Sequence, residues 1–204
     1  MTKVIPQIEI HPVVLRLKPV IQLTDDQLFE LCQLNGDWRI EYTAQGELIV
    51  MPPTGGETSN RNMEITFQLQ SWTRQDQTGV AFDSSGGFNL PNGAMRSPDA
   101  AWVRRSRLAG LTRDQKQKFL PLCPDFVIEL RSPTDNLKAL QDKMQEYMDN
   151  GARLGWLIDA LTRRVQVYLP QRPPEIIEAP NTVSADPLLP GFALNLQTIW
   201  EPDL

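Results

Sequence analysis

Residues 125–130, DFVIEL, constrain the fold of this 204-residue chain more than any other segment, because after Asp125 they form a compact apolar run with one acid, Glu129, inside it. The length and composition of the run predict a buried β-strand. Residues 132–135, SPTD, then supply a turn and a helix start, and apolar side chains recur at helical spacing until Gly151. A second apolar run, LGWLID at 154–159, predicts another strand. A buried strand, a helix and a second strand therefore follow one another along the chain.

Further elements precede this unit. Thr24 is an N-cap candidate for a short helix that Gly36 closes. Trp38, Ile40 and Tyr42 then alternate with polar residues before a turn at Gln45-Gly46, which predicts a β-hairpin. Residues 58–77 carry one apolar stripe, which predicts a long helix facing a sheet. Residues 80–103 read as short strands with a tight turn at Asn92-Gly93.

The two ends of the chain show no sustained period. Residues 1–22 contain three prolines and are predicted to form an extended arm, and residues 170–204 are predicted to form one Pro-rich strand and a wrapping tail after the hairpin that 154–159 begins. The length suits one core, so we expect a single domain over 1–204.

Composition excludes several classes of function. A net charge of −5 excludes a protein that coats nucleic acid by bulk electrostatics, and the single histidine, His11, excludes mechanisms that need two. Cys32 and Cys123 show no CxxC spacing and are expected to be reduced thiols. No apolar stretch is long enough for a membrane span and no secretion signal is evident, so we expect a cytoplasmic protein with no membrane partner.

Residues 104–118 carry a net charge of +5 inside this acidic chain. Two interpretations stay open. The stretch is either a patch that takes phosphates of a nucleic acid or the solvated face of an amphipathic helix.

Two acids in apolar strands point to a metal. An ionised Glu129 inside its strand is costly unless something pairs with it, and Asp99 poses the same problem at the start of the predicted strand 98–103. Two such acids on neighbouring strands would repel, and a hard divalent cation, Mg²⁺ or Mn²⁺, would compensate them. The alternative is that each acid pairs with an Arg or caps a turn. If the two acids instead repel as proposed, replacing one of them by Ala is expected to cost the metal-free protein little stability.

A lysine on the following helix is the third candidate. Lys143 borders the apolar stripe, three residues after Leu140 and four before Tyr147. Its side chain either reaches along the surface to water or extends its ammonium toward the two carboxylates.

At these residues the sequence resembles the Uma-type putative restriction endonucleases of the PD-(D/E)xK nuclease superfamily. The resemblance covers about residues 24–168 and is carried by four strings in this order and spacing: MPPTGGETSNRN, RSPDAAWV, CPDFVIELRSPTD and LQDKMQEYMDNGARLGWLID. It implies an α/β (α+β) protein with a restriction-endonuclease-like core, a central mixed β-sheet flanked by helices, preceded here by the N-terminal helix and β-hairpin.

The resemblance also implies roles. Asp99 matches the motif aspartate and Glu129 the acid of the ExK element, and the implied metal ligands are Asp99, Glu129 and Leu130. The chain departs from the pattern two residues after Glu129, where Arg131 stands in place of lysine and cannot act as a base. The lysine looks moved to Lys143, which with Tyr147 also resembles the QxxxY element of RecB-like nucleases.

An acid on the first long helix often joins such sites. Glu57 is preferred for this role over Glu64, although an acid at a helix N-terminus also acts simply as a cap.

The resemblance implies an Mg²⁺- or Mn²⁺-dependent endonuclease that hydrolyses DNA phosphodiester bonds. A homodimer is expected, since cutting a duplex requires two sites. Two alternatives stay open. One is a catalytically weak nuclease fold used as a nucleic-acid or protein binding module, and the other is a small-molecule hydrolase on the same metal site.

Overall fold

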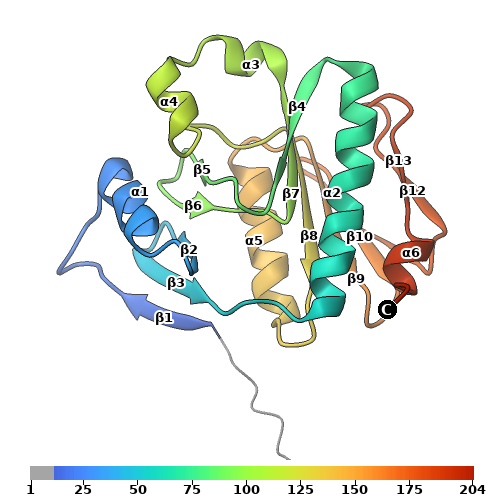
Figure 1. Ribbon diagram of the computed structural model, residues 1–204, viewed down its shortest axis with the longest axis horizontal. Helices are drawn as coiled ribbons and strands as arrows, with labels where there is room; N and C mark the ends of the chain where they lie inside the picture. The colour runs from blue at the N-terminus through green and yellow to red at the C-terminus, as the bar shows by residue number, and fades with distance from the viewer. Residues whose placement is uncertain (1–11) are drawn as a thin grey trace, which may run out of the picture.

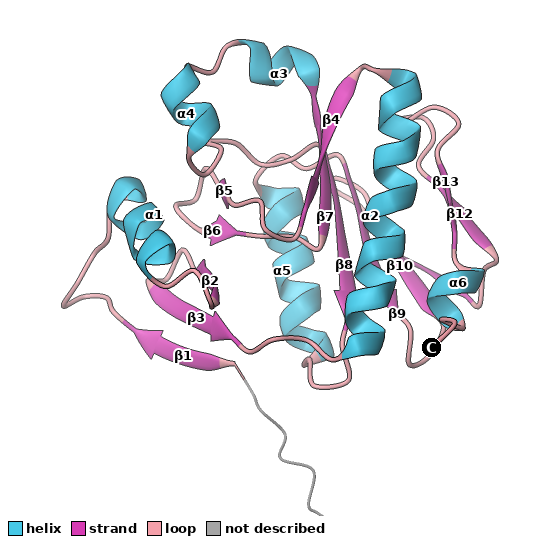
Figure 2. Ribbon diagram, viewed as in Figure 1, coloured by secondary structure: helices cyan, strands magenta, loops and turns pink. Residues whose placement is uncertain are grey.

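A six-stranded mixed sheet is the centre of the computed structural model, which describes residues 12–204 (Figures 1 and 2). β8 (Phe126–Arg131) and β9 (Leu154–Asp159) run parallel, and every other neighbouring pair in this sheet is antiparallel. The mixed sheet that the sequence predicted is therefore confirmed. Its order is β11 (Glu175–Glu178), β10 (Arg164–Tyr168), β9 (Leu154–Asp159), β8 (Phe126–Arg131), β7 (Ala100–Arg104) and β4 (Gly79–Asp83).

The predicted strand around Glu129 is β8, and it lies in the middle of this sheet. Ala100 of β7 pairs with Ile128 on one side, and Leu157 of β9 pairs with Glu129 on the other. Both faces of β8 are covered, because side chains of β8 belong to two different hydrophobic clusters. This explains why its sequence is continuously apolar rather than alternating.

Two helices cover opposite faces of the sheet. Helix α2 (Gly56–Asp76) packs Ile65 and Leu69 into the cluster that contains Phe126 and Ile128. Helix α5 (Leu137–Asp149) packs Met144 and Tyr147 into the cluster that contains Val127. Because strand side chains alternate, Glu129 lies on the same face as Val127, the face that α5 covers.

A second, five-stranded sheet lies beside the first. Its order is β1 (Val13–Arg16), β3 (Glu47–Met51), β2 (Arg39–Tyr42), β6 (Met95–Arg96) and β5 (Phe88–Asn89), and helix α1 (Asp25–Leu34) packs on it. The predicted helix and hairpin are confirmed, including the cap, since Thr24 forms a capping box with Gln27. Ile40 and Tyr42 join the core under α1. Arg39 and Glu41 therefore face away from α1.

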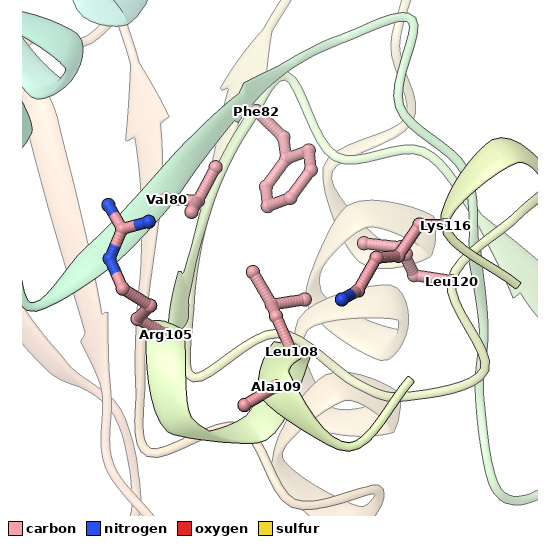
Figure 3. Close-up of a pocket in the computed structure, with 7 residues that line it drawn as sticks. All are labelled: Val80, Phe82, Arg105, Leu108, Ala109, Lys116 and Leu120. Carbon is pink, nitrogen blue, oxygen red and sulfur yellow. The ribbon is translucent and has the colours of Figure 1, made fainter. Parts of the chain in front are cut away.

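The basic stretch 104–118 folds into two short helices, α3 (Arg105–Ala109) and α4 (Arg113–Gln117), that follow β7 directly. Part of its charge is used inside the fold. Arg105 donates to backbone carbonyls of Gln77 and Gly79, Arg107 pairs with the buried Asp125, and Lys118 pairs with Asp26 and Asp114. Leu108 lies in an apolar pocket of about 310 Å³ that residues of β4, α3 and α4 line. Figure 3 shows Leu108 between Arg105 and Lys116.

The C-terminal region contains more structure than predicted. In place of one strand and a tail, residues 170–204 form β11, the hairpin of β12 (Thr182–Ser184) and β13 (Ala193–Asn195), and helix α6 (Gln197–Trp200). Each of these elements is only three or four residues long, which is too short for a hydrophobic period to show among the prolines. Leu189, Phe192 and Ile199 nevertheless pack in the same cluster as Phe126.

The N-terminal arm also contributes a strand. Val13–Arg16 pairs with β3, whereas residues 1–11 of the predicted arm lie outside the described residues. Among the residues that are described, no helix is long and apolar enough to cross a membrane. Both cysteines are free thiols, Cys123 buried and Cys32 partly buried.

Candidate active site

Asp99 and Glu129 meet where β7 begins and β8 approaches its end. Asp99 is buried and directly precedes β7, and its Oδ2 accepts the backbone N–H of Leu130 at 2.9 Å. Glu129 is buried beside it in β8, so the two predicted acids are brought together on neighbouring strands as expected.

Helix α5 supplies two contacts to Glu129. The Lys143 ammonium lies 2.8 Å from Glu129 Oε1, and the Tyr147 hydroxyl donates to the same oxygen at 3.0 Å. Lys143 and Tyr147 are one helical turn apart and face the sheet together, which is why both reach one carboxylate. Lys143 therefore extends inward to the carboxylate, and only 11% of its side chain is exposed.

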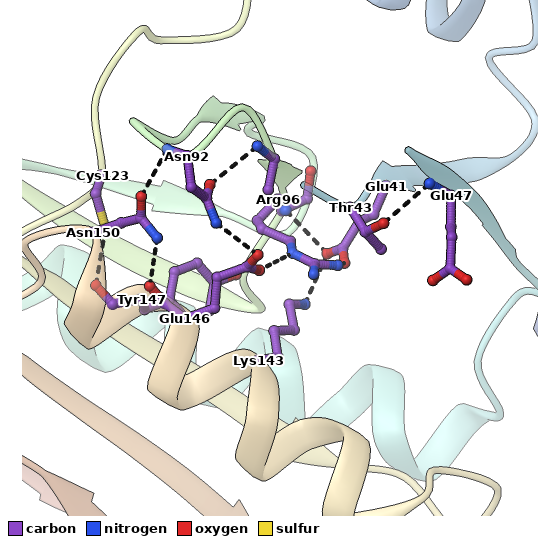
Figure 4. A network of polar contacts seen from close by, with 12 residues as sticks. Glu41, Thr43, Glu47, Asn92, Arg96, Cys123, Lys143, Glu146, Tyr147 and Asn150 are labelled. Atoms are coloured by element: carbon purple, nitrogen blue, oxygen red, sulfur yellow. Dashed lines mark hydrogen bonds and ion pairs between the residues drawn. The ribbon is translucent and has the colours of Figure 1, made fainter. Parts of the chain in front are cut away.

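Glu41 of β2 is a third buried acid at this site, which the sequence analysis did not identify. Its Oε1 accepts from Lys143 Nζ at 2.7 Å and from the backbone N–H of Ser97 at 3.0 Å, and its Oε2 pairs with Arg96 at 3.1 Å. Arg96 in turn pairs with Glu146 of α5 at 2.6 Å. Figure 4 shows Lys143 and Arg96 converging on Glu41 from α5 and β6.

Arg39 of β2 adds a second residue that the sequence analysis did not identify. Its Nη1 donates to Asp99 Oδ1 at 2.9 Å, and its Nη2 donates to the backbone carbonyl of Ser97. Its Nε is buried without a hydrogen-bond partner among residues 12–204. Arg39 and Glu41 are two residues apart on one strand, so both point to the same site.

The two glutamates have opposite electrostatic environments. Burial raises the pKa of Glu129 to about 7, with Asp99 and Glu41 acting in the same direction against the attraction of Lys143. Burial also penalises the charge of Glu41, but Lys143 and Arg96 outweigh it and lower its pKa to about 2. Burial opposes the charge of Lys143 as well, yet Glu129 and Glu41 raise its pKa above the ordinary value. Lys143 is thus an ammonium at neutral pH.

The donor chemistry fits a hard cation. Lys143 and Tyr147 both contact Oε1 of Glu129, which leaves Oε2 as a possible ligand, and each oxygen of Asp99 can accept more than one bond. The Leu130 carbonyl points to the same side of β8 as its N–H, toward Asp99. No three Asp, Glu, His or Cys side chains within 12–204 form a ready-made metal cage, but this ligand set needs only two acidic side chains and a carbonyl.

The contacts of Arg131 and Lys143 show which of these two residues lies beside the motif acids. Arg131 Nη1 pairs with Asp159 of β9 at 2.8 Å, whereas Lys143 contacts Glu129. Of these two residues, it is therefore Lys143 that occupies the position of a lysine beside the motif acids.

The acids of α2 lie elsewhere. Glu57 is 61% exposed and pairs with Arg61, and Glu64 accepts from Gln68, whose amide also contacts Asn195. The buried apolar side chains of α2 pack on the face of the sheet opposite to Glu129. The structure brings Asp99, Glu129 and Lys143 together but places neither Glu57 nor Glu64 in contact with them, and Glu41 is the additional acid instead.

A groove of about 1010 Å³ opens beside Lys143, between the β1–β3–β2 hairpin region and α5. Acids outnumber bases along it: Glu41, Glu47, Asp135, Asp142, Glu146 and Asp149 against Arg96 and Lys143. The basic helices α3 and α4 lie at the other end of β7 from Asp99, because β7 runs from Ala100 to Arg104 and α3 begins at Arg105.

Comparisons with known proteins agree with this architecture. The structure resembles the crystal structure of "a putative nuclease belonging to DUF820" from Anabaena variabilis, with a TM-score of 0.73 and 21% sequence identity over 88% of this chain and 98% of that chain. No curated protein matches the sequence. The model of the Uma2 family, described as "Putative restriction endonuclease", matches residues 25–197. This match spans most of the sequence and includes both Asp99 and Glu129, so the chain belongs to the Uma2 family.

Proposed function

We propose that this protein is a metal-dependent endonuclease that hydrolyses DNA phosphodiester bonds. The observation that carries the proposal is the convergence of two buried acids and one lysine from three elements: Asp99 holds the Leu130 N–H, and Lys143 lies 2.8 Å from Glu129. Family membership and fold support a nuclease. The choice of DNA rests on the description of the family model as a putative restriction endonuclease, and the metal requirement rests on the chemistry of the site.

Asp99, Glu129 and the Leu130 carbonyl would hold the cation, Mg²⁺ or Mn²⁺. When bound, such an ion supplies charge neutralisation at the phosphate and a more acidic water. Burial raises the pKa of Glu129 against the attraction of Lys143, and a cation bound at this carboxylate would favour its charged form.

Lys143 would act as a charged donor rather than as a base. Its pKa is raised by Glu129 and Glu41 against the effect of burial, so its ammonium keeps its proton at neutral pH. From its position beside Glu129 it can orient the attacking water or stabilise the negative charge that develops on the phosphate. The proton of the water then passes to another acceptor, since Lys143 already carries its proton and Glu129 would be engaged by the cation.

The test is nicking of supercoiled plasmid with Mg²⁺ or Mn²⁺, with EDTA as the blank. Asp99→Asn, Glu129→Gln and Lys143→Met are expected to abolish nicking while retaining the fold. Lys138→Met is the matched control for Lys143, since it lies on the same helix but is 75% exposed. Glu178→Gln, 63% exposed on β11, is the control for Glu129. If wild type and Asp99→Asn leave plasmid and single strands equally uncut with both metals, the nuclease proposal is wrong.

The acidic groove favours a second candidate, a nuclease fold that works as a binding module for a basic protein. Six acids and two bases line it, and a polyanion would enter it only with bound cations. Metal binding separates the two functions. Crystals grown with Mn²⁺ would show density between Asp99 and Glu129 for the nuclease, whereas a binding module needs none.

We also propose a two-fold homodimer, since one chain provides one site and a duplex has two strands. Exposed apolar side chains on β1 support this proposal, because β1 is the edge of the five-stranded sheet among the described strands.

A further inference from the structure

We propose that Arg39 is an exchangeable cation: it holds Asp99 while the site is free of metal, and it moves to a phosphate of the substrate when a divalent cation takes Asp99. This inference rests on the proposed nuclease function. It assigns to Arg39 a substrate-binding role that the metal-free contacts alone do not display.

The buried cluster already holds a cation beside the proposed metal ligands. Four acids, Glu41, Asp99, Glu129 and Glu146, face three cations, Arg39, Arg96 and Lys143. A divalent ion at Asp99 and Glu129 would add two positive charges directly beside Arg39, which pairs with Asp99. Like charges at such short range are unfavourable in a buried site, so one cation should leave.

Arg39 is the cation of this cluster that can leave most easily. Arg96 is held by two carboxylates, Glu41 and Glu146, and Lys143 is held by two, Glu41 and Glu129. Arg39 pairs with Asp99, a proposed metal ligand, and its side chain is 27% exposed against 10% for Arg96 and 11% for Lys143. Arg39 is therefore both the least buried cation of the cluster and the one whose carboxylate the metal would use.

Arg39 also has a hydrogen-bond donor, Nε, that is not used in the metal-free protein. Its Nε is buried without a partner among residues 12–204, although its neighbouring Nη atoms are bonded. A guanidinium binds phosphate with two parallel N–H groups, and Nε with Nη2 forms such a fork. A phosphate oxygen would satisfy the orphaned Nε.

The test measures Mn²⁺ binding without DNA, by electron paramagnetic resonance of the free ion. Arg39→Met, which keeps length but removes charge, is expected to bind Mn²⁺ about tenfold more tightly, because no internal cation competes for Asp99. Arg16→Met is the matched control, since Arg16 is 84% exposed and pairs with Glu47, and its Mn²⁺ affinity should equal that of wild type. An unchanged or weaker Mn²⁺ affinity in Arg39→Met overturns the inference, the weaker one because it shows that Arg39 only orients Asp99.

A second variant covers the case in which Arg39→Met does not fold. Arg39→Lys keeps the competing charge but lacks the fork, so its Mn²⁺ affinity should stay within about twofold of wild type while its affinity for duplex DNA in Ca²⁺ falls about tenfold. Unchanged DNA affinity overturns the inference. If wild type itself binds no Mn²⁺, the nuclease proposal fails and the inference fails with it. If Asp99→Asn abolishes Mn²⁺ binding but Arg39→Met leaves the Mn²⁺ affinity unchanged, only the inference is overturned.

Discussion

Lys143 of α5 and Glu41 of β2 form a 2.7 Å ion pair that joins the helix on the central sheet to the second sheet. The same ammonium contacts Glu129, so Glu41 fixes where the lysine stands relative to the motif acid. Residues that orient a catalytic group in this way contribute to rate without touching the substrate.

Glu41→Gln should therefore lower the nicking rate at saturating metal about 10- to 100-fold, the usual cost of removing such a partner. The amide still accepts from the Ser97 N–H, so the fold should persist. Single-turnover rates over a range of DNA concentrations provide the measurement. Apparent DNA affinity should stay constant, and a variant that cuts as fast as wild type would contradict the positioning role.

The same glutamate predicts an acid sensitivity of the metal-free protein. Although burial opposes its charge, Lys143 and Arg96 lower the pKa of Glu41 to about 2 from 4.5. The unfolded chain therefore takes up the proton first, and the stability that Glu41 contributes is complete above pH 4.5 and is lost as the pH falls toward 2. This loss amounts to about 3 kcal/mol.

Urea unfolding in EDTA between pH 6 and pH 2 measures this effect. Wild type should lose more stability over that range than Glu41→Gln, whereas the exposed-site control Glu178→Gln should follow wild type. Parallel curves for wild type and Glu41→Gln would show that the ion pairs of Glu41 do not contribute.

The fold followed closely from local sequence patterns, but the site followed only in part. β8, α5 and the hairpin carry strong periods or compact apolar runs, and the structure places them as predicted. Asp99 and Glu129 were identifiable because a buried carboxylate in an apolar strand is costly unless it has a partner. The polar positions of β2 gave no such signal, since an alternating strand normally turns its polar residues to water.

Arg39 and Glu41 are recognisable as site residues only from the packing of β2 against the central sheet, with Ile40 under α1 on the other face. The alternation of β2 shows that Arg39 and Glu41 share a face but not what that face meets. Glu57 illustrates the converse. Its position at a helix start suggested a site residue, yet in the structure it pairs with Arg61 of its own helix.

Asp99→Ala should destabilise the metal-free protein by about 2–4 kcal/mol, because it leaves the Leu130 N–H and the Arg39 guanidinium without their partner. The sequence alone suggested little loss, since removing one of two repelling acids relieves repulsion. Asp99→Asn, which retains an acceptor, should lose less. Thermal unfolding in EDTA tests the order, and an alanine variant as stable as wild type would show that repulsion dominates.

The proposed dimer predicts a mass of twice 23.1 kDa by light scattering. Val13 and Leu15 are 56% and 49% exposed on β1, so a Val13→Glu, Leu15→Glu variant should be monomeric. A matched control changes Val20 and Ile21 to Glu, which are also exposed but lie outside the strand. Wild type at 23.1 kDa at working concentration would contradict the dimer.

Arg131 provides the sharpest test of where the catalytic lysine belongs. Arg131 lies two residues after Glu129 on β8, on the same face, but Asp159 holds it at 2.8 Å. Arg131→Lys in a Lys143→Met background should therefore recover little nicking, since the new lysine keeps the buried Asp159 as its partner. Adding Asp159→Asn, whose oxygen can still accept from the Leu161 N–H, should free the lysine and raise the rate about tenfold over the double variant.

Asp159→Asn alone should leave wild-type nicking unchanged. Full recovery by Arg131→Lys without the Asp159 change would show that Asp159 does not restrain this position, and no recovery in the triple variant would show that the lysine must come from α5.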